Sequence, residues 1–170
     1  DYPLKMLIFN RARMVKNSKN RIPFGIELLQ KHKRDSWIVF TENKKQAKEF
    51  NKIINTKGYK SAIYNTDLDN AEREENLNNF KNGNLNVLVS CTALDEGFDM
   101  PEADGAMILS ASSSKRQRIQ RMGRVLRITA NKQNALIVTV YSSKTEFDKL
   151  REESNRYKLE GVPVKWQQMK

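Results

Sequence analysis

The residues best suited to chemistry lie in an arginine-dense octapeptide, Gln120–Arg127, which contains a single glycine. On a helix, Gln120, Arg124 and Arg127 stand at i, i+4 and i+7, so one face carries an amide and two guanidinium groups. A guanidinium group is planar, keeps its charge and donates paired hydrogen bonds that match phosphate oxygens. The octapeptide therefore predicts a phosphate clamp; the alternative is an ordinary solvated basic helix face.

The pattern of apolar residues predicts the strands and helices that must position this clamp. Short continuous apolar runs alternate with segments in which apolar residues recur at helical spacing. Continuous runs of this kind are typical of strands that are buried on both faces of a parallel sheet, and they occur at residues 37–40, 61–64, 87–89, 106–109 and 135–140. Capping-box pairs precede three of the expected helices: Asn43 with Gln46, Asp69 with Glu72, and Ser143 with Glu146. Short strand–helix links require right-handed crossovers, so we predict an α/β fold with a mainly parallel sheet of about five strands.

Ligands of open parallel sheets bind at the carboxyl ends of the strands. This rule predicts that Thr41, residues 91–99 and residues 110–114 share one functional edge. Within the second segment, Gly97 between Glu96 and Phe98 indicates a backbone that approaches a ligand closely or takes a positive φ. An ordinary loop with a capping aspartate is the alternative for this segment.

The charge and the apolar content of the chain limit the kinds of molecule that the protein is expected to bind. The 170 residues form one domain and carry 31 Lys+Arg against 20 Asp+Glu, a net charge of +11. Such an excess favours a polyanionic partner, with nucleic acid ahead of an anionic membrane. No apolar run approaches the roughly 20 residues of a membrane helix, no signal peptide is visible, and no basic amphipathic helix has a bulky aromatic face. We therefore expect an intracellular protein, cytoplasmic or associated with the nucleoid or nucleus, without a membrane partner.

Two residue types exclude other chemistry. Cys91 is the single cysteine, so an internal disulfide framework and a cysteine-rich zinc site are both excluded, and no metal site is predicted. His32 is the single histidine and lies in a Lys-His-Lys-Arg run, which is typical of solvated surface. A nucleophile–histidine–carboxylate relay would depend on that one residue and is not favoured.

The motifs together resemble a known family. Four segments, residues 37–43, 69–83 (with Arg73 and Phe80), 90–101 and 120–127, occur in the order and spacing of the second RecA-like domain of superfamily 2 helicases. The sequences Asp-Glu-Gly-Phe-Asp-Met-Pro at 95–101 and Gln-Arg-x-Gly-Arg-x-Leu-Arg are most similar to XPB-type repair translocases, phage recombination helicases and restriction-enzyme motor subunits. The resemblance implies a RecA-like three-layer αβα sandwich over residues 1–170, with residues 1–17 and 142–170 as flanking elements.

The same resemblance implies roles for residues at the phosphates. Arg124 and Arg127 resemble arginine fingers that reach the γ-phosphate of ATP, and Gln120 resembles the polar residue beside them. Arg121 resembles a residue that ties the helix to neighbouring elements. Gly97 and Asp99 resemble a turn that senses the nucleotide.

Thr41, Cys91 and Thr92 resemble the positions that hold the nucleic-acid backbone. Cys91 departs from the family, which has Ser or Thr at this position. Because a thiol is a weak donor, the contact could fall to a backbone N–H or to Thr92. A small hydrophobic residue that ends a buried strand is the alternative for Cys91.

The sequence lacks the other half of an ATP site. It contains no GxxxxGK[ST] and no Asp-Glu pair that ends a strand. It also opens at Asp1 rather than at a methionine, so we expect a fragment of a longer protein. In that protein an upstream RecA-like domain would bind most of the ATP and Mg²⁺, and the isolated chain would not hydrolyse ATP.

The sequence leaves three functions open. The first is the C-terminal motor half of an ATP-dependent DNA helicase or translocase. The second is an RNA-directed helicase or sensor, because backbone contacts do not report base identity and only 2′-hydroxyl contacts report the sugar. The third is a non-catalytic nucleic-acid-binding module, which the intact Gln120, Arg124 and Arg127 disfavour.

Overall fold

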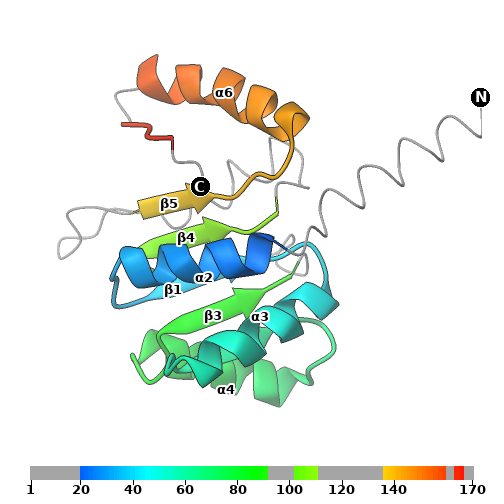
Figure 1. Ribbon diagram of the computed structural model, residues 1–170. Helices are drawn as coiled ribbons and strands as arrows, with labels where there is room; N and C mark the ends of the chain where they lie inside the picture. Colours follow the sequence, from blue (N-terminus) through cyan, green and yellow to red (C-terminus); the bar gives the residue numbers. More distant parts are fainter. Residues whose placement is uncertain (1–19, 92–101, 111–135, 160–162, 167–170) are drawn as a thin grey trace, which may run out of the picture.

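The computed structural model describes residues 20–91, 102–110, 136–159 and 163–166 (Figure 1). Along the chain its elements are α2 (Arg21–Lys31), β1 (Trp37–Phe40), α3 (Lys44–Thr56), β2 (Ser61–Tyr64), α4 (Asn70–Lys81), β3 (Val87–Ser90), β4 (Gly105–Ile108), β5 (Leu136–Thr139) and α6 (Lys144–Leu159). Each predicted strand is present to within one residue at either end.

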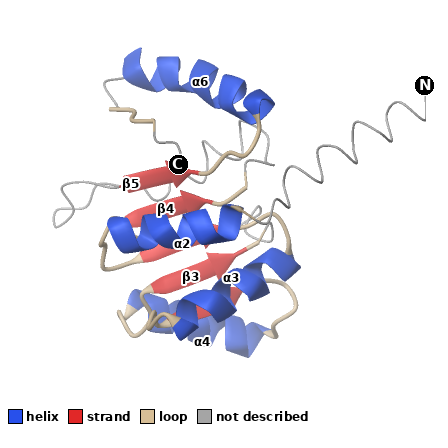
Figure 2. Cartoon of the chain, viewed as in Figure 1, coloured by secondary structure: helices blue, strands red, loops and turns tan. Residues whose placement is uncertain are grey.

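The five strands form one sheet in the order β2-β3-β1-β4-β5, and every neighbouring pair is parallel. The prediction of a parallel α/β sheet is thus confirmed. Since all strands point the same way, all their carboxyl ends lie along one edge of the sheet (Figure 2).

Helices cover both faces of the sheet, which confirms the three-layer arrangement. On one face α2 and α3 pack against β1, β3 and β4, and the fully buried side chains of Leu29, Phe50 and Ile54 lie in this cluster. On the other face Phe80 of α4 packs with Ile38 and other strand residues. Helix α6 lies beyond β5 at the end of the sheet (Figure 1).

The helix starts predicted from the capping pairs are confirmed. Each predicted capping residue accepts a hydrogen bond from the backbone N–H three positions on: Asn43 from Gln46 (2.9 Å), Asp69 from Glu72 (2.7 Å) and Ser143 from Glu146 (3.2 Å). Gly58 and Gly83 follow α3 and α4 with φ of 87° and 75°, a conformation that glycine adopts without strain.

Within the described residues, no helix combines the length and the apolar character that crossing a membrane requires. The same part of the chain holds no group of three or more His, Cys, Asp or Glu side chains that could bind a metal ion.

Candidate functional site

The carboxyl edge of the sheet is lined by polar residues that directly follow the strands. Strand β1 leads to Thr41, β3 ends at Ser90 and leads to Cys91, and β4 leads through Leu109 to Ser110. Because β1 lies between β3 and β4, Thr41 is flanked by the ends of both neighbours. The topology therefore brings Thr41, Cys91 and Ser110 to one edge, as expected from the sequence.

Thr41 is bonded within the protein rather than open to solvent. Its side chain is buried, its backbone N–H donates to the carbonyl oxygen of Ser90 (2.8 Å), and its hydroxyl lies 3.2 Å from that oxygen and 3.3 Å from the carbonyl oxygen of Asn43. The hydroxyl thus ties the end of β1 to the end of β3 and to the start of α3. A phosphate contact through this hydroxyl requires it to exchange these partners.

Cys91 is also buried, at 3% exposure, and its thiol forms no disulfide. The hydroxyl of Ser90 donates to the carbonyl oxygen of Cys91 (2.9 Å). This burial agrees with the alternative reading of Cys91 as a small apolar residue that ends a buried strand.

Glu42 is a member of this edge that the sequence reasoning missed. Its carboxylate accepts a hydrogen bond from the Ser110 hydroxyl (3.3 Å), and its backbone N–H donates to the side-chain oxygen of Gln46 (3.0 Å). The glutamine of the predicted capping box thus reaches back to Glu42 rather than to the cap residue. Glu42 joins the end of β1 to the end of β4, and no sequence pattern marks this contact.

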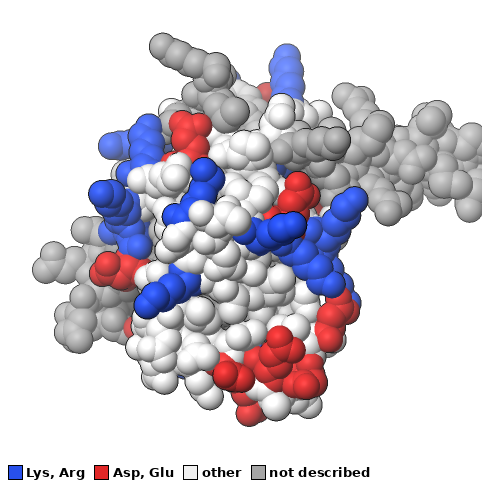
Figure 3. Space-filling model, turned by 60° about the horizontal axis from the view of Figure 1, so that its bottom comes forward, with Lys and Arg blue, Asp and Glu red and all other residues white. Residues whose placement is uncertain are grey.

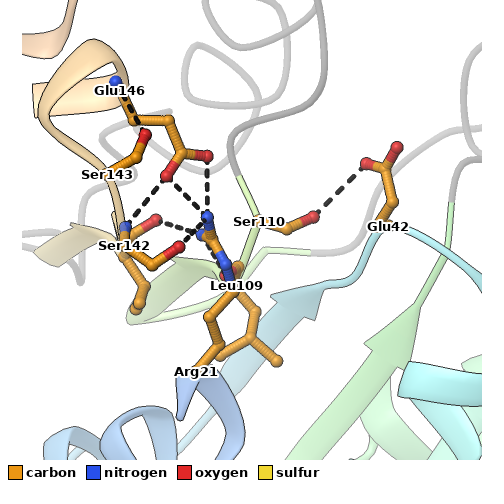
Figure 4. Close-up of polar contacts among 8 residues, drawn as sticks. Arg21, Glu42, Leu109, Ser110, Ser142, Ser143 and Glu146 are labelled. Atoms are coloured by element: carbon orange, nitrogen blue, oxygen red, sulfur yellow. Dashed lines mark hydrogen bonds and ion pairs between the residues drawn. The ribbon is translucent and has the colours of Figure 1, made fainter. Parts of the chain in front are cut away.

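Arg21, the first residue of α2, is the most buried charge of the described residues, with a side chain that is 0% exposed. Its guanidinium donates to the carbonyl oxygens of Leu109 (3.1 Å) and Val140 (2.9 Å), to the Ser142 hydroxyl (2.8 Å), and to both carboxylate oxygens of Glu146 (2.7 and 2.6 Å) (Figure 4). Glu146 also accepts a hydrogen bond from the backbone N–H of Ser142 (2.9 Å), the residue before the cap residue Ser143.

This arrangement, which we call the Arg21 clasp (Arg21, Leu109, Val140, Ser142 and Glu146), joins four elements. It fastens the start of α2 and the start of α6 to the ends of β4 and β5. The clasp therefore fixes the backbone of Leu109, the residue before Ser110. The sequence interpretation missed Arg21. A cation at the first residue of a helix is disfavoured by the helix dipole, and this unusual position was the one feature of the sequence that could have indicated its role.

The remaining predicted site residues lie outside the described residues: Thr92, Gly97, Asp99, Gln120, Arg121, Arg124 and Arg127. Their segments, 92–101 and 111–135, follow Cys91 and Ser110. Both segments therefore leave the described part of the protein at the carboxyl edge.

At the end of β2, Tyr64 is 9% exposed, and this burial raises its pKa. Arg73 of α4 opposes the rise, whereas Glu74 adds to it. The Asn76 amide donates to the carbonyl oxygen of Ile63 (3.1 Å) and holds α4 against this strand. Tyr64 and Arg73 thus belong to the packing of α4 on the β2 end of the sheet.

The surface charge of the described residues is mixed in sign. Figure 3 shows acidic side chains gathered at the lower end of one face and basic side chains spread above them. Helix α4 and its cap contribute four exposed carboxylates, at Asp69, Glu72, Glu74 and Glu75. The face in Figure 3 is therefore not a uniformly basic surface, although the whole chain carries +11.

Comparison with known proteins identifies the family of this chain. Residues 20–129 match the model of the helicase conserved C-terminal domain. The DNA 3'-5' translocase XPB2 of Sulfurisphaera tokodaii is 36% identical over 129 residues, which are 76% of this chain and 28% of that protein. The ATP-dependent RNA helicase DBP3 of Candida glabrata is 30% identical over 104 residues, or 58% of this chain and 19% of that protein.

The fold is similar to that of the C-terminal domain of the DEAD-box protein Dbp5, with a TM-score of 0.71 and 23% identity over 84% of this chain and 81% of that chain. The chain spans less than a third of the length of the curated relatives named here. The family model nevertheless covers well over half of the chain. The chain belongs to the helicase C-terminal domain family of superfamily 2.

Proposed function

We propose that this chain is the C-terminal motor half of an ATP-dependent DNA helicase or translocase. The observation that supports this most strongly is the parallel strand order, which brings the ends of β1, β3 and β4 to one edge. The two segments with the predicted phosphate-binding residues begin at that edge, directly after Cys91 and Ser110. A single edge can then face both a nucleotide and a nucleic-acid backbone.

We assign the ATP chemistry to residues of segments 92–101 and 111–135. Arg124 and Arg127 act as arginine fingers, Gln120 contacts the phosphates beside them, and Gly97 and Asp99 form the turn that responds to the nucleotide. Arg121 ties the fingers to neighbouring elements. Arginine fingers supply about 10³–10⁵ in rate by stabilising charge in the transition state.

An upstream RecA-like domain of the same protein binds most of the ATP and Mg²⁺ in this proposal. The sequence offers no GxxxxGK[ST] of its own, and the described residues contribute no group of metal ligands. Bound Mg²⁺ neutralises charge that develops on the phosphates. This chain closes on the loaded upstream domain, and by itself it does not turn over ATP.

Nucleic acid is held at the carboxyl edge through its backbone. Since the Thr41 hydroxyl has partners within the protein and Cys91 is buried, we assign Thr41 and Cys91 to shaping the edge. Direct contacts then fall to Thr92 and to backbone N–H groups. Backbone contacts position a strand without reading its sequence, as translocation requires.

We favour DNA over RNA because the similarity to the XPB2 translocase is higher and covers more of this chain than the similarity to the RNA helicase DBP3. The RNA helicase supports an RNA-directed motor as the second candidate. In either case residues 1–17 and 142–170 flank the helicase domain, and the Arg21 clasp attaches the second flank to it through Glu146.

The experiment that tests this proposal is ATP turnover by the longer protein with single-stranded DNA, duplex DNA and RNA in turn, at one fixed salt concentration. We expect stimulation by a polymer, strongest with DNA. Stimulation by RNA alone would transfer the proposal to the RNA-directed candidate. ATP turnover that none of the three polymers stimulates would count against a nucleic-acid motor and would favour a non-catalytic role for this chain.

A further inference from the structure

Three aromatic rings meet at the β5 end of the carboxyl edge. Tyr141 follows β5, Phe147 lies in the first turn of α6, and Trp166 lies near the end of the chain. The ring centres of Phe147 and Trp166 are 5.0 Å apart at 70°, and those of Tyr141 and Trp166 are 6.1 Å apart at 73°. Tyr141 and Phe147 are 5.3 Å apart. We call these three side chains the aromatic cluster.

Trp166 is held by the cluster yet open to solvent. Both neighbouring rings meet it nearly edge to face, a favourable aromatic geometry, so its orientation is fixed before any ligand arrives. It is 40% exposed and is the single large hydrophobic side chain that is exposed among the described residues. A preoriented, exposed indole loses little conformational freedom when another ring stacks on it.

Positive charges border the aromatic cluster. On α6, Lys144, Phe147 and Arg151 stand at i, i+3 and i+7, so two cations flank the phenyl ring along one helix face. Lys165 directly precedes Trp166. All three cations are exposed, and the ion pairs found within the described residues involve other side chains.

From this juxtaposition we propose that the aromatic cluster is a stacking site for a base of single-stranded nucleic acid. Trp166 contacts the base, and Lys144, Arg151 and Lys165 attract the neighbouring phosphates. Stacking on an aromatic ring tolerates any base and suits a motor that moves along a strand. An apolar protein partner would fit the indole but would gain nothing from the three cations.

The location supports the same occupant, and here the inference rests on the proposed function. Thr41 follows β1 and Tyr141 follows β5, two strands away in the sheet. With neighbouring strands about 4.8 Å apart, the two positions are about 10 Å apart along the edge. A few nucleotides of one strand can span this separation and join a backbone held beside Thr41 to a base on Trp166.

The chain carries its own probe for this site. It has two tryptophans; Trp37 is 1% exposed and Trp166 is 40% exposed, so a surface ligand that stacks on an indole quenches Trp166. The test titrates the 170-residue chain with oligodeoxythymidine of about 12 nucleotides, within the usual site sizes, and records tryptophan emission beside the anisotropy of labelled oligomer. We expect quenching that saturates together with binding.

An abasic oligomer of the same length separates stacking from charge attraction. It carries the phosphates without bases, so we expect it to bind more weakly and to leave the emission unchanged. Trp166→Ala should weaken oligodeoxythymidine binding about tenfold, at the lower end of the range for one stacked base, whereas Trp166→Phe should keep it within about threefold. Circular dichroism checks that both variants stay folded.

The possible results distinguish a failure of the stacking site from a failure of the proposed function. Binding of oligodeoxythymidine with unchanged emission, or with an affinity that Trp166→Ala leaves intact, overturns the stacking site while leaving the proposed function standing. Equal quenching by the abasic oligomer also overturns it. Failure of the wild-type chain to bind any oligomer counts against nucleic-acid binding itself, and the proposed function fails with it.

Discussion

Replacing Arg21 with methionine is the sharpest test of how the carboxyl edge is held together. Methionine keeps the length and the packing of the side-chain stem, but it removes the guanidinium from the Arg21 clasp. The carbonyl oxygens of Leu109 and Val140 then lose a donor. The Glu146 carboxylate, whose side chain is 13% exposed, loses its partner charge.

The expected loss of stability follows from these contacts. Removing one partner of a buried ion pair costs about 3–5 kcal/mol, because the other charge stays behind without compensation. Relief of an unfavourable charge at the start of a helix returns about 0.3–1 kcal/mol. We therefore expect the free energy of unfolding to fall by about 3–4 kcal/mol, and Tm to fall by about 6–16 °C for a domain of this size.

Urea denaturation followed by circular dichroism measures this change. Arg34→Met is the matched control, because Arg34 is exposed in the loop after α2; it should stay within about 0.5 kcal/mol of the wild type. The double variant Arg21→Met/Glu146→Gln, which removes the stranded carboxylate, should recover part of the loss. A loss below about 1 kcal/mol for Arg21→Met would refute the idea that the clasp holds the ends of β4 and β5.

Three further predictions concern packing, capping and pH. Gly25→Ala should destabilise the protein by about 1–3 kcal/mol, because the new Cβ would lie 2.6 Å from Cδ1 of the buried Leu109. This loss should outweigh the gain in helix propensity of about 1 kcal/mol. A variant that is more stable than the wild type in urea would contradict the prediction. Asp69→Ala should cost about 1 kcal/mol through loss of the α4 cap, whereas Asp67→Ala, which breaks an exposed ion pair, should cost less than Asp69→Ala in the same assay. Burial raises the pKa of Tyr64 in the folded state. Above about pH 10, near the ordinary pKa of tyrosine, the folded protein therefore retains a proton that the unfolded chain has released. The free energy of unfolding consequently falls as the pH rises above about 10. Tyr64→Phe removes this contribution and should flatten the loss of stability above pH 10; an unchanged pH profile would contradict it.

The elements of the fold could be predicted because their signals are local. The run Trp37–Phe40 needs only its own residues to indicate a strand that is buried on both faces. The caps at Asn43 and Asp69 likewise depend on a partner three residues away. Parallel pairing followed from strand–helix alternation, since a helix that crosses one face of the sheet returns the chain to the end from which the next strand starts in the same direction.

The contacts that build the candidate site could not be predicted because they join residues far apart in the chain. Arg21 meets Glu146 across 125 positions, and Ser110 meets Glu42 across 68. The burial of Thr41 depends on Ser90, a neighbour that only the strand order supplies. The contacts of Trp166 with Tyr141 and Phe147 also join separate parts of the chain, and no local pattern indicates that 40% of Trp166 stays exposed.

We propose above that this chain supplies arginine fingers to an ATP site that an upstream domain completes. The most direct measurement compares ATP turnover by the longer protein with that of its Arg124→Ala and Arg116→Ala variants, at saturating DNA and with ATP affinity measured separately. We expect Arg124→Ala to lower kcat by about 10³–10⁵ with little change in ATP affinity, while Arg116→Ala stays close to the wild type. A loss below about tenfold for Arg124→Ala, or equal losses in both variants, would contradict it.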